Sequence, residues 1–144
     1  MKKRRYFADP SAIYKLMGRI QPFTASEQMQ LNLPVRLAFD SLKNGVGSEG
    51  DFHTLASAVN IAMICAEKIS VEVEDVCIAA RDAMARMWLR YKRTERWGFD
   101  GPAIQEVADC IDVYEQLTGL LTGGQLKEAM QECVKRMQAG QVLE

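Results

Sequence analysis

Apolar residues recur at steps of three and four positions along most of the chain, which is the period of an amphipathic α-helix. The clearest stripe lies in residues 72–93 and is formed by Val73, Val76, Cys77, Ala80, Met84, Met87, Trp88 and Tyr91. Apolar and polar residues alternate, as they do in a strand, in the short segment 69–73 alone. The pattern therefore predicts an all-α protein.

Capping residues divide this pattern into about six helices. Side chains that cap helix N-termini precede the apolar stretches at Asp9, Thr24, Ser48, Asp100 and Thr122. Glycines that favour helix C-termini follow three of the stretches, at Gly45, Gly119 and Gly140. The predicted helices cover approximately residues 10–19, 25–43, 49–66, 72–93, 102–118 and 126–139.

The third predicted helix is apolar on all sides, because residues 55–66 contain almost no polar side chain. A helix without a polar face is usually buried, so we expect the other helices to pack around this one. Asn60 interrupts the apolar stretch, and we expect it to fix the register of helix packing. In the second helix, Pro34 removes a backbone hydrogen bond and predicts a kink or a break near Leu33.

The chain has 144 residues, a length that suits one domain. We expect a flexible basic arm at residues 1–8, a helical domain at 9–140 and a frayed C-terminus at 141–144. No apolar run reaches the roughly 20 residues that cross a bilayer, and no apolar signal-peptide core follows the basic start. The sequence therefore predicts a cytoplasmic protein without membrane contact.

Residues that usually carry catalysis or bind metals are few and scattered. The one histidine, His53, lies in the first turn of the third helix, where we expect it to cap the helix or to form hydrogen bonds in the core. Three carboxylates of the fifth helix are expected to face solvent: Asp109, Asp112 and Glu115. The cysteines lie singly within predicted helices, which favours buried thiols over zinc ligands: Cys65, Cys77, Cys110 and Cys133. The sequence predicts a protein that is not an enzyme and holds no metal or cofactor.

The net charge is −1, but basic residues gather in two segments. The segment 81–96 carries six basic residues against Asp82 and Glu95, and two aromatic residues follow it. Arginine beside aromatic side chains is typical of binding hot spots. We therefore predict a partner-binding segment formed by Arg86, Arg90, Lys92, Arg93, Arg96, Trp97 and Phe99. The alternative is a solvated helix end whose charge matches the helix dipole.

The second basic segment is the N-terminus, where residues 1–19 carry six basic residues against Asp9. A basic arm can contact phosphates or enter a minor groove. The alternative function is therefore a nucleic-acid-binding regulator that uses the arginine-rich helix end together with Lys2, Lys3, Arg4, Arg5 and Tyr6. A tail that serves solubility explains the same composition.

Several segments resemble small helical proteins of temperate phages and prophages of Gram-negative bacteria. The matching stretches are residues 2–6 before Pro10, residues 37–42 with Gly45 and Gly47, residues 51–62, residues 97–99 before Pro102, and residues 136–140. The resemblance implies a bacterial cytoplasm and no catalytic residues. It also implies a role in occupying a host protein, such as a defence nuclease, or in regulating transcription.

Together these patterns predict a non-enzymatic, phage-type protein that binds and modulates, by inhibition, a host protein such as a defence factor. A self-associating structural subunit is a further alternative. It is favoured by the acidic segments 40–75 and 100–144, each with a net charge of −5, which complement the basic ones. A homodimer would bring such opposite charges together.

Overall fold

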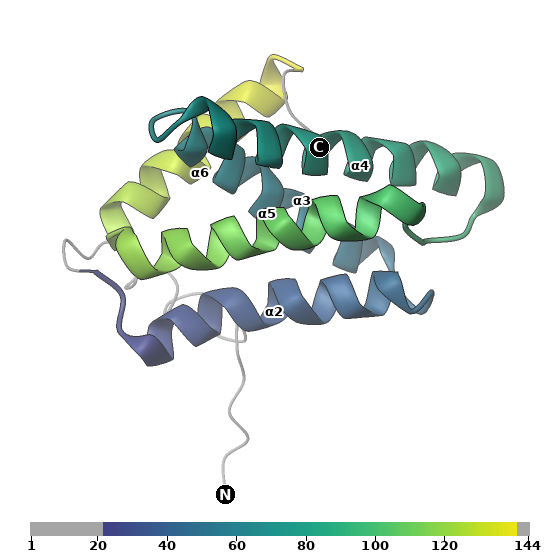
Figure 1. Cartoon of the computed structure of the whole chain (residues 1–144), viewed down its shortest axis with the longest axis horizontal. Coiled ribbons are helices and arrows are strands. Elements are labelled where there is room, and N and C mark those ends of the chain that lie inside the picture. Colours follow the sequence, from purple (N-terminus) through teal and green to yellow (C-terminus); the bar gives the residue numbers. More distant parts are fainter. Residues whose placement is uncertain (1–21, 141–144) are drawn as a thin grey trace, which may run out of the picture.

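The computed structural model describes residues 22–140, and this part of the chain forms five α-helices. They are α2 (Ala25–Lys43), α3 (Glu49–Ala66), α4 (Val71–Thr94), α5 (Gly101–Leu120) and α6 (Gly123–Gln138), shown in Figure 1. The described residues contain no strand, and their one β-bridge joins Pro22 to Thr122. The prediction of an all-α helical bundle is confirmed.

The helix count differs from the predicted six because the first predicted helix, residues 10–19, lies outside the described residues. The basic arm at residues 1–8 and the C-terminal residues 141–144 also lie outside them. None of the helices in the described range is both long and apolar enough to cross a membrane.

Side-chain caps set the start of each described helix. The hydroxyl groups of Thr24, Ser48 and Thr122 accept hydrogen bonds from backbone amides three residues ahead, and each pair forms a capping box. Asp100 caps α5 in the same manner, with Pro102 in the first turn. Ser70 caps α4, so the alternating segment 69–73 is the start of a helix and not a strand.

Helix α2 continues through Pro34 without a break. Of the kink or break expected near Leu33, the break does not occur, because buried side chains on both sides of the proline, Leu31 and Val35, hold the two halves against the same core. The helix ends at Lys43, Asn44 is its C-cap, and Gly45 follows in the left-handed region with φ of 76°. The amides of Gly45 and the next residue bond back to the last turn, which is the Schellman arrangement expected at such a glycine.

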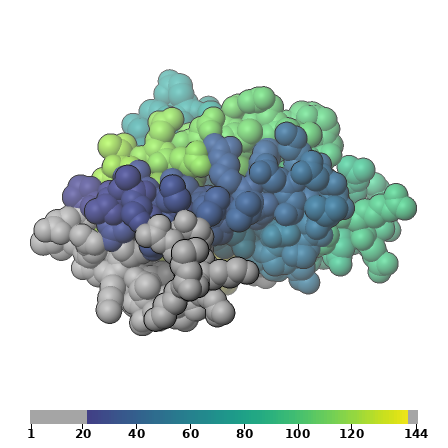
Figure 2. Space-filling model, turned by 90° about the horizontal axis from the view of Figure 1, so that it is seen from below, coloured from purple at the N-terminus to yellow at the C-terminus, as the bar shows by residue number. Residues whose placement is uncertain are grey.

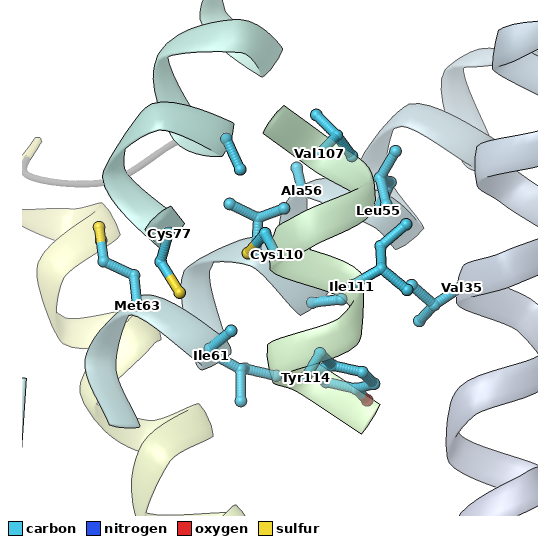
Figure 3. Close-up of a cluster of buried hydrophobic side chains, with 14 of the residues drawn as sticks. Val35, Leu55, Ala56, Ile61, Met63, Cys77, Val107, Cys110, Ile111 and Tyr114 are labelled. Atoms are coloured by element: carbon cyan, nitrogen blue, oxygen red, sulfur yellow. The ribbon is translucent and has the colours of Figure 1, made fainter. Parts of the chain in front are cut away.

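The core lies where α2, α3, α4 and α5 meet. Helix α3 contacts each of the four other described helices, and every residue from 58 to 64 is buried, including Asn60, which is 1% exposed. Figure 3 shows side chains from four helices converging, among them Val35, Ile61, Cys77 and Ile111. Helices α4 and α5 pack side by side, and this pair supports the surface described next (Figure 1).

Candidate functional site

The end of α4 and the loop that follows it form a projecting corner of the molecule. The Thr94 hydroxyl donates to the Arg90 carbonyl at 2.8 Å in the last turn, and Glu95 adopts the left-handed conformation with φ of 58°. The chain then turns back to Asp100, the N-cap of α5. Figures 1 and 2 show this corner at one end of the molecule, beyond the end of α2. The sequence predicted its residues as a partner-binding segment.

Aromatic stacking holds the loop against α3 and α4. The rings of Tyr91 and Trp97 lie parallel, with centroids 3.9 Å apart, and Trp97 also stacks on Phe52 at 5.1 Å. Phe52 is 1% exposed, so the stack reaches into the core. Phe99 packs against Phe39 at 5.4 Å. Trp97 and Phe99 are therefore half-buried residues that position the loop, and each presents part of its surface to solvent.

Arg86 connects α4 to the first turns of α5. Its Nε lies 2.8 Å from an oxygen of Asp100, and its Nη2 lies 2.8 Å from an oxygen of Glu106. The guanidinium of Arg86 holds the pKa of Asp100 below its usual range. Arg86 is thus set apart from the other cations of the predicted partner-binding segment, because it has acidic partners within the protein.

The other four predicted cations point to solvent. Arg90, Lys92, Arg93 and Arg96 are exposed, and no ion pair joins them to any residue in the described part of the chain. Leu89, which is 65% exposed, lies one turn before Lys92 and Arg93 on the same helix face. We name Leu89, Arg90, Lys92, Arg93 and Arg96 the basic patch.

Leu89 is the member of this patch that the sequence did not predict. It lies outside the core stripe of α4, which places Met84, Met87 and Trp88 inward. Its position in the sequence, between Arg86 and Arg90 and outside the apolar stripe, could have identified Leu89 as an exposed apolar residue. Lys92 adds an aromatic contact, with its Nζ 5.4 Å from the centre of the Trp88 ring.

The other sequence candidates do not converge with the basic patch. His53 is an exposed residue whose Nε2 lies 3.4 Å from Glu49, and Ser48 caps α3, so the prediction that His53 caps the helix or forms hydrogen bonds in the core is wrong. Its ring lies edge-on to the buried ring of Phe52, with the two centroids 5.7 Å apart. Among the described residues, no group of three side chains is arranged to hold a metal ion.

Two of the carboxylates that were expected to face solvent, Asp112 and Glu115, also connect α5 to α2. Arg36 of α2 lies 2.7 Å from an oxygen of Asp112 and 2.7 Å from an oxygen of Glu115. Asp112 is exposed, as expected of a solvated face, and Glu115 is half-buried beside the Arg36 guanidinium. Asp109, the third carboxylate, accepts a hydrogen bond from Gln105 on its own helix.

The cysteines belong to the core. Cys77, Cys110 and Cys133 are buried and Cys65 is half-buried, as predicted from their apolar neighbours. The sulfur atoms of Cys77 and Cys110 face each other between α4 and α5 (Figure 3). Contact with Cys77 and burial raise the pKa of Cys110, and burial raises the pKa of Cys65. Raised pKa values keep these two thiols protonated at neutral pH, the form that is a poor nucleophile.

Comparison of the chain with known protein families, curated proteins and solved structures finds no match. The resemblance to phage and prophage proteins stays a prediction from residue patterns. The function is therefore inferred from the surface geometry of the corner.

Proposed function

We propose that this is a non-enzymatic interaction protein that binds an acidic surface of another protein through the basic patch. The observation that carries the proposal is a group of four exposed cations that form no ion pair in the described part of the chain, set around the exposed Leu89. Charged side chains around an apolar centre are the usual composition of a protein interface.

The corner is held in place before any partner arrives. The buried face of α4 anchors its cations through residues such as Met84 and Met87, and the Arg86–Asp100 ion pair fixes the return of the chain. The stack of Tyr91 on Trp97 orders the loop. A surface that is already ordered loses little conformational entropy on binding, which favours affinity.

The packing of the aromatic rings within the protein favours a protein partner over nucleic acid. Single-stranded nucleic acids bind by stacking bases on exposed aromatic faces. Here Tyr91 and Trp97 stack on each other, and the opposite face of the cluster rests on buried Phe52. The exposed leucine has no role in phosphate binding, but it suits the apolar centre of a protein contact.

The resemblance of several segments to phage and prophage proteins, predicted from the sequence, supports a bacterial host protein as the partner. Under this proposal the partner is a bacterial host protein, such as a defence factor, and the protein inhibits it by covering an acidic functional surface. An exposed, ordered basic patch is electrostatically complementary to such an acidic surface, which favours encounter and specificity.

The test is a double charge reversal, Arg90→Glu with Arg93→Glu, compared with Lys127→Glu with Lys135→Glu on exposed positions of α6. Both variants change the net charge equally. We expect the first to weaken partner binding at least about tenfold, because attraction becomes repulsion at two sites, and the second to bind normally. Equal binding by the two variants, both with native circular dichroism spectra, would exclude the basic patch.

A nucleic-acid partner is the second candidate, supported by the exposed cations Arg90 and Arg93 on one helix face. An α-helix fits the major groove of DNA, and binding through phosphates weakens steeply with salt. Under this alternative, removal of residues 2–5 would lower affinity further, and nuclease treatment would abolish capture of the partner. Binding that survives nuclease contradicts it.

A further inference from the structure

A second surface lies far from the basic patch, in a cleft of about 600 Å³ between the ends of α3 and α5 and one side of α6. Leu117 and Leu121 of α5 line it, near the C-terminal end of that helix, whereas the basic patch lies beside its N-terminal end. Some 17 residues of helix at 1.5 Å each separate these positions by about 25 Å. The two surfaces are therefore independent.

The floor of the cleft is apolar, and its rim carries the acidic residues Glu67, Glu128 and Glu132 together with the cations Lys68 and Arg136. Ile64, Leu117 and Ala129 are buried side chains that line it, so an apolar ligand would find a hydrophobic contact there. Glu128 and Glu132 stand one helical turn apart along the α6 side. Glu128 is exposed, and no cation in the described range pairs with it.

Arg136 already occupies the far end of this acidic row. It pairs with Glu132 at 3.0 Å on α6 and with Glu67 at the end of α3. This arrangement closes one end of the cleft with a charge network and leaves Glu128, nearer the start of α6, for another cation. Glu128 therefore lies on the side of the cleft where the chain enters the bundle.

The chain enters the described structure beside this cleft. Pro22 forms a β-bridge with Thr122, the residue that caps α6, and Phe23 is buried. The start of the purple segment in Figure 1 accordingly lies at the corner between α5 and α6. Leu121 and Gln125, which flank Thr122 in sequence, both line the cleft. The segment that precedes residue 22 therefore starts at the cleft's rim.

The preceding segment has the composition that the cleft requires. Its sequence predicts a helix from Pro10, with an apolar stripe formed by Ile13, Leu16, Met17 and Ile20. Lys15 and Arg19 are four residues apart, which is the spacing of Glu128 and Glu132 on α6. A helix of 11 residues is about 16 Å long, and residues 125–136 of α6 span about the same length.

We propose that residues 10–20 dock in this cleft as a helix antiparallel to α6, with the apolar stripe on the floor and Arg19 beside Glu128. The antiparallel direction follows from the entry point, because residue 20 must lie near the start of α6. Lys15 then lies near Glu132. The bundle so completed has six helices.

Hydrogen–deuterium exchange of the full chain tests this docking. A helix of about 11 residues is marginal in water by itself, so strong amide protection in the peptide covering residues 10–20 reports packing against the bundle. We expect this protection in the wild-type protein. Leu16→Asp should lower it at least about tenfold because it removes a buried apolar side chain.

The charge pairing is tested by reversal and rescue. Arg19→Glu and Glu128→Lys should each reduce protection of residues 10–20 about threefold, and the double variant should restore it, because attraction returns with opposite signs. Glu95→Lys, the same charge change at the corner of α4, is the matched control and should leave the protection unchanged. Arg90→Glu with Arg93→Glu should also leave it unchanged, which separates this result from the proposed binding function.

Two outcomes would overturn the proposal. Residues 10–20 of the wild-type protein exchanging at the rate of an unstructured peptide would show that they do not dock. Protection that neither Arg19→Glu nor Glu128→Lys lowers would place the helix elsewhere than the cleft.

Discussion

Arg36 illustrates how one side chain can join helices that are distant in sequence. Its guanidinium forms two hydrogen bonds with Glu115, at 2.7 and 2.9 Å, and one with Asp112 at 2.7 Å. The sequence alone could not predict this contact, because it depends on the rotation of α2 relative to α5. The same limitation applies to Arg86, whose acidic partners come from the next helix.

Arg36→Ala should lower the free energy of unfolding by about 1 kcal/mol, because the ion pairs are partly exposed and their loss leaves two carboxylates close together. Arg36→Lys keeps the charge but loses the fork geometry of the guanidinium, so its effect should be smaller. Urea denaturation monitored by circular dichroism measures both. An unchanged midpoint in Arg36→Ala would contradict a structural role for the ion pairs.

Asp100 makes stability depend on pH. Its ion pair with Arg86 and its hydrogen bond to the Ala103 amide lower its pKa in the folded protein. As the pH falls, the Asp100 carboxylate is therefore protonated near pH 3.9 in the unfolded chain and only at a lower pH in the folded protein. The stabilisation that charged Asp100 contributes is lost as the pH falls from about 3.9 through the lower pKa of the folded state. Asp100→Asn retains a capping side chain but no charge. Its unfolding free energy should fall less steeply than that of the wild type between pH 5 and pH 2.5, and parallel curves would contradict this.

At the scale of elements, local chemistry determines most helix boundaries, and these were predictable. Thr24, Asp100 and Thr122 cap the helices that the sequence assigned to them. Pro34 could not be resolved in advance, because whether a helix survives a proline depends on the tertiary contacts that hold its two halves. Ser70 was missed because its segment alternates like a strand over a few residues, too short a window to distinguish the two periods.

The turn between α2 and α3 depends on a close approach at Gly47. A Cβ atom there would lie 2.5 Å from a methyl carbon of Leu42 and 3.1 Å from its Cα. Leu42 is 0% exposed and cannot move aside, so Gly47→Ala should destabilise the protein by about 1–3 kcal/mol.

Gly50 is the matched control for this substitution. A Cβ atom at Gly50 would meet the hydroxyl of Ser48 at an ordinary 3.6 Å, and the residue lies in the first turn of α3. Gly50→Ala should therefore be neutral or stabilise by up to about 1 kcal/mol. Thermal unfolding of both variants decides the point, and similar melting temperatures for the two would contradict the close approach at Gly47.

At the scale of the whole molecule, the bundle separates two surfaces with different chemistry. The basic patch lies beside the start of α5, and the cleft with its apolar floor and charged rim lies beside the end of α5. The sequence predicted the cations of the corner but assigned Trp97 and Phe99 to binding without their structural role. It could not predict the cleft, which is formed by three helices that meet only after folding.

The central claim is that the basic patch recognises an acidic protein surface. Its most direct test is capture of partners from nuclease-treated bacterial lysate by the tagged wild-type protein, by Arg90→Glu with Arg93→Glu, and by Lys127→Glu with Lys135→Glu, followed by mass spectrometry. We predict one protein that the wild type and the α6 control retain and that the corner variant loses. Retention of the same protein by all three, or loss of every partner after nuclease treatment, would contradict the claim.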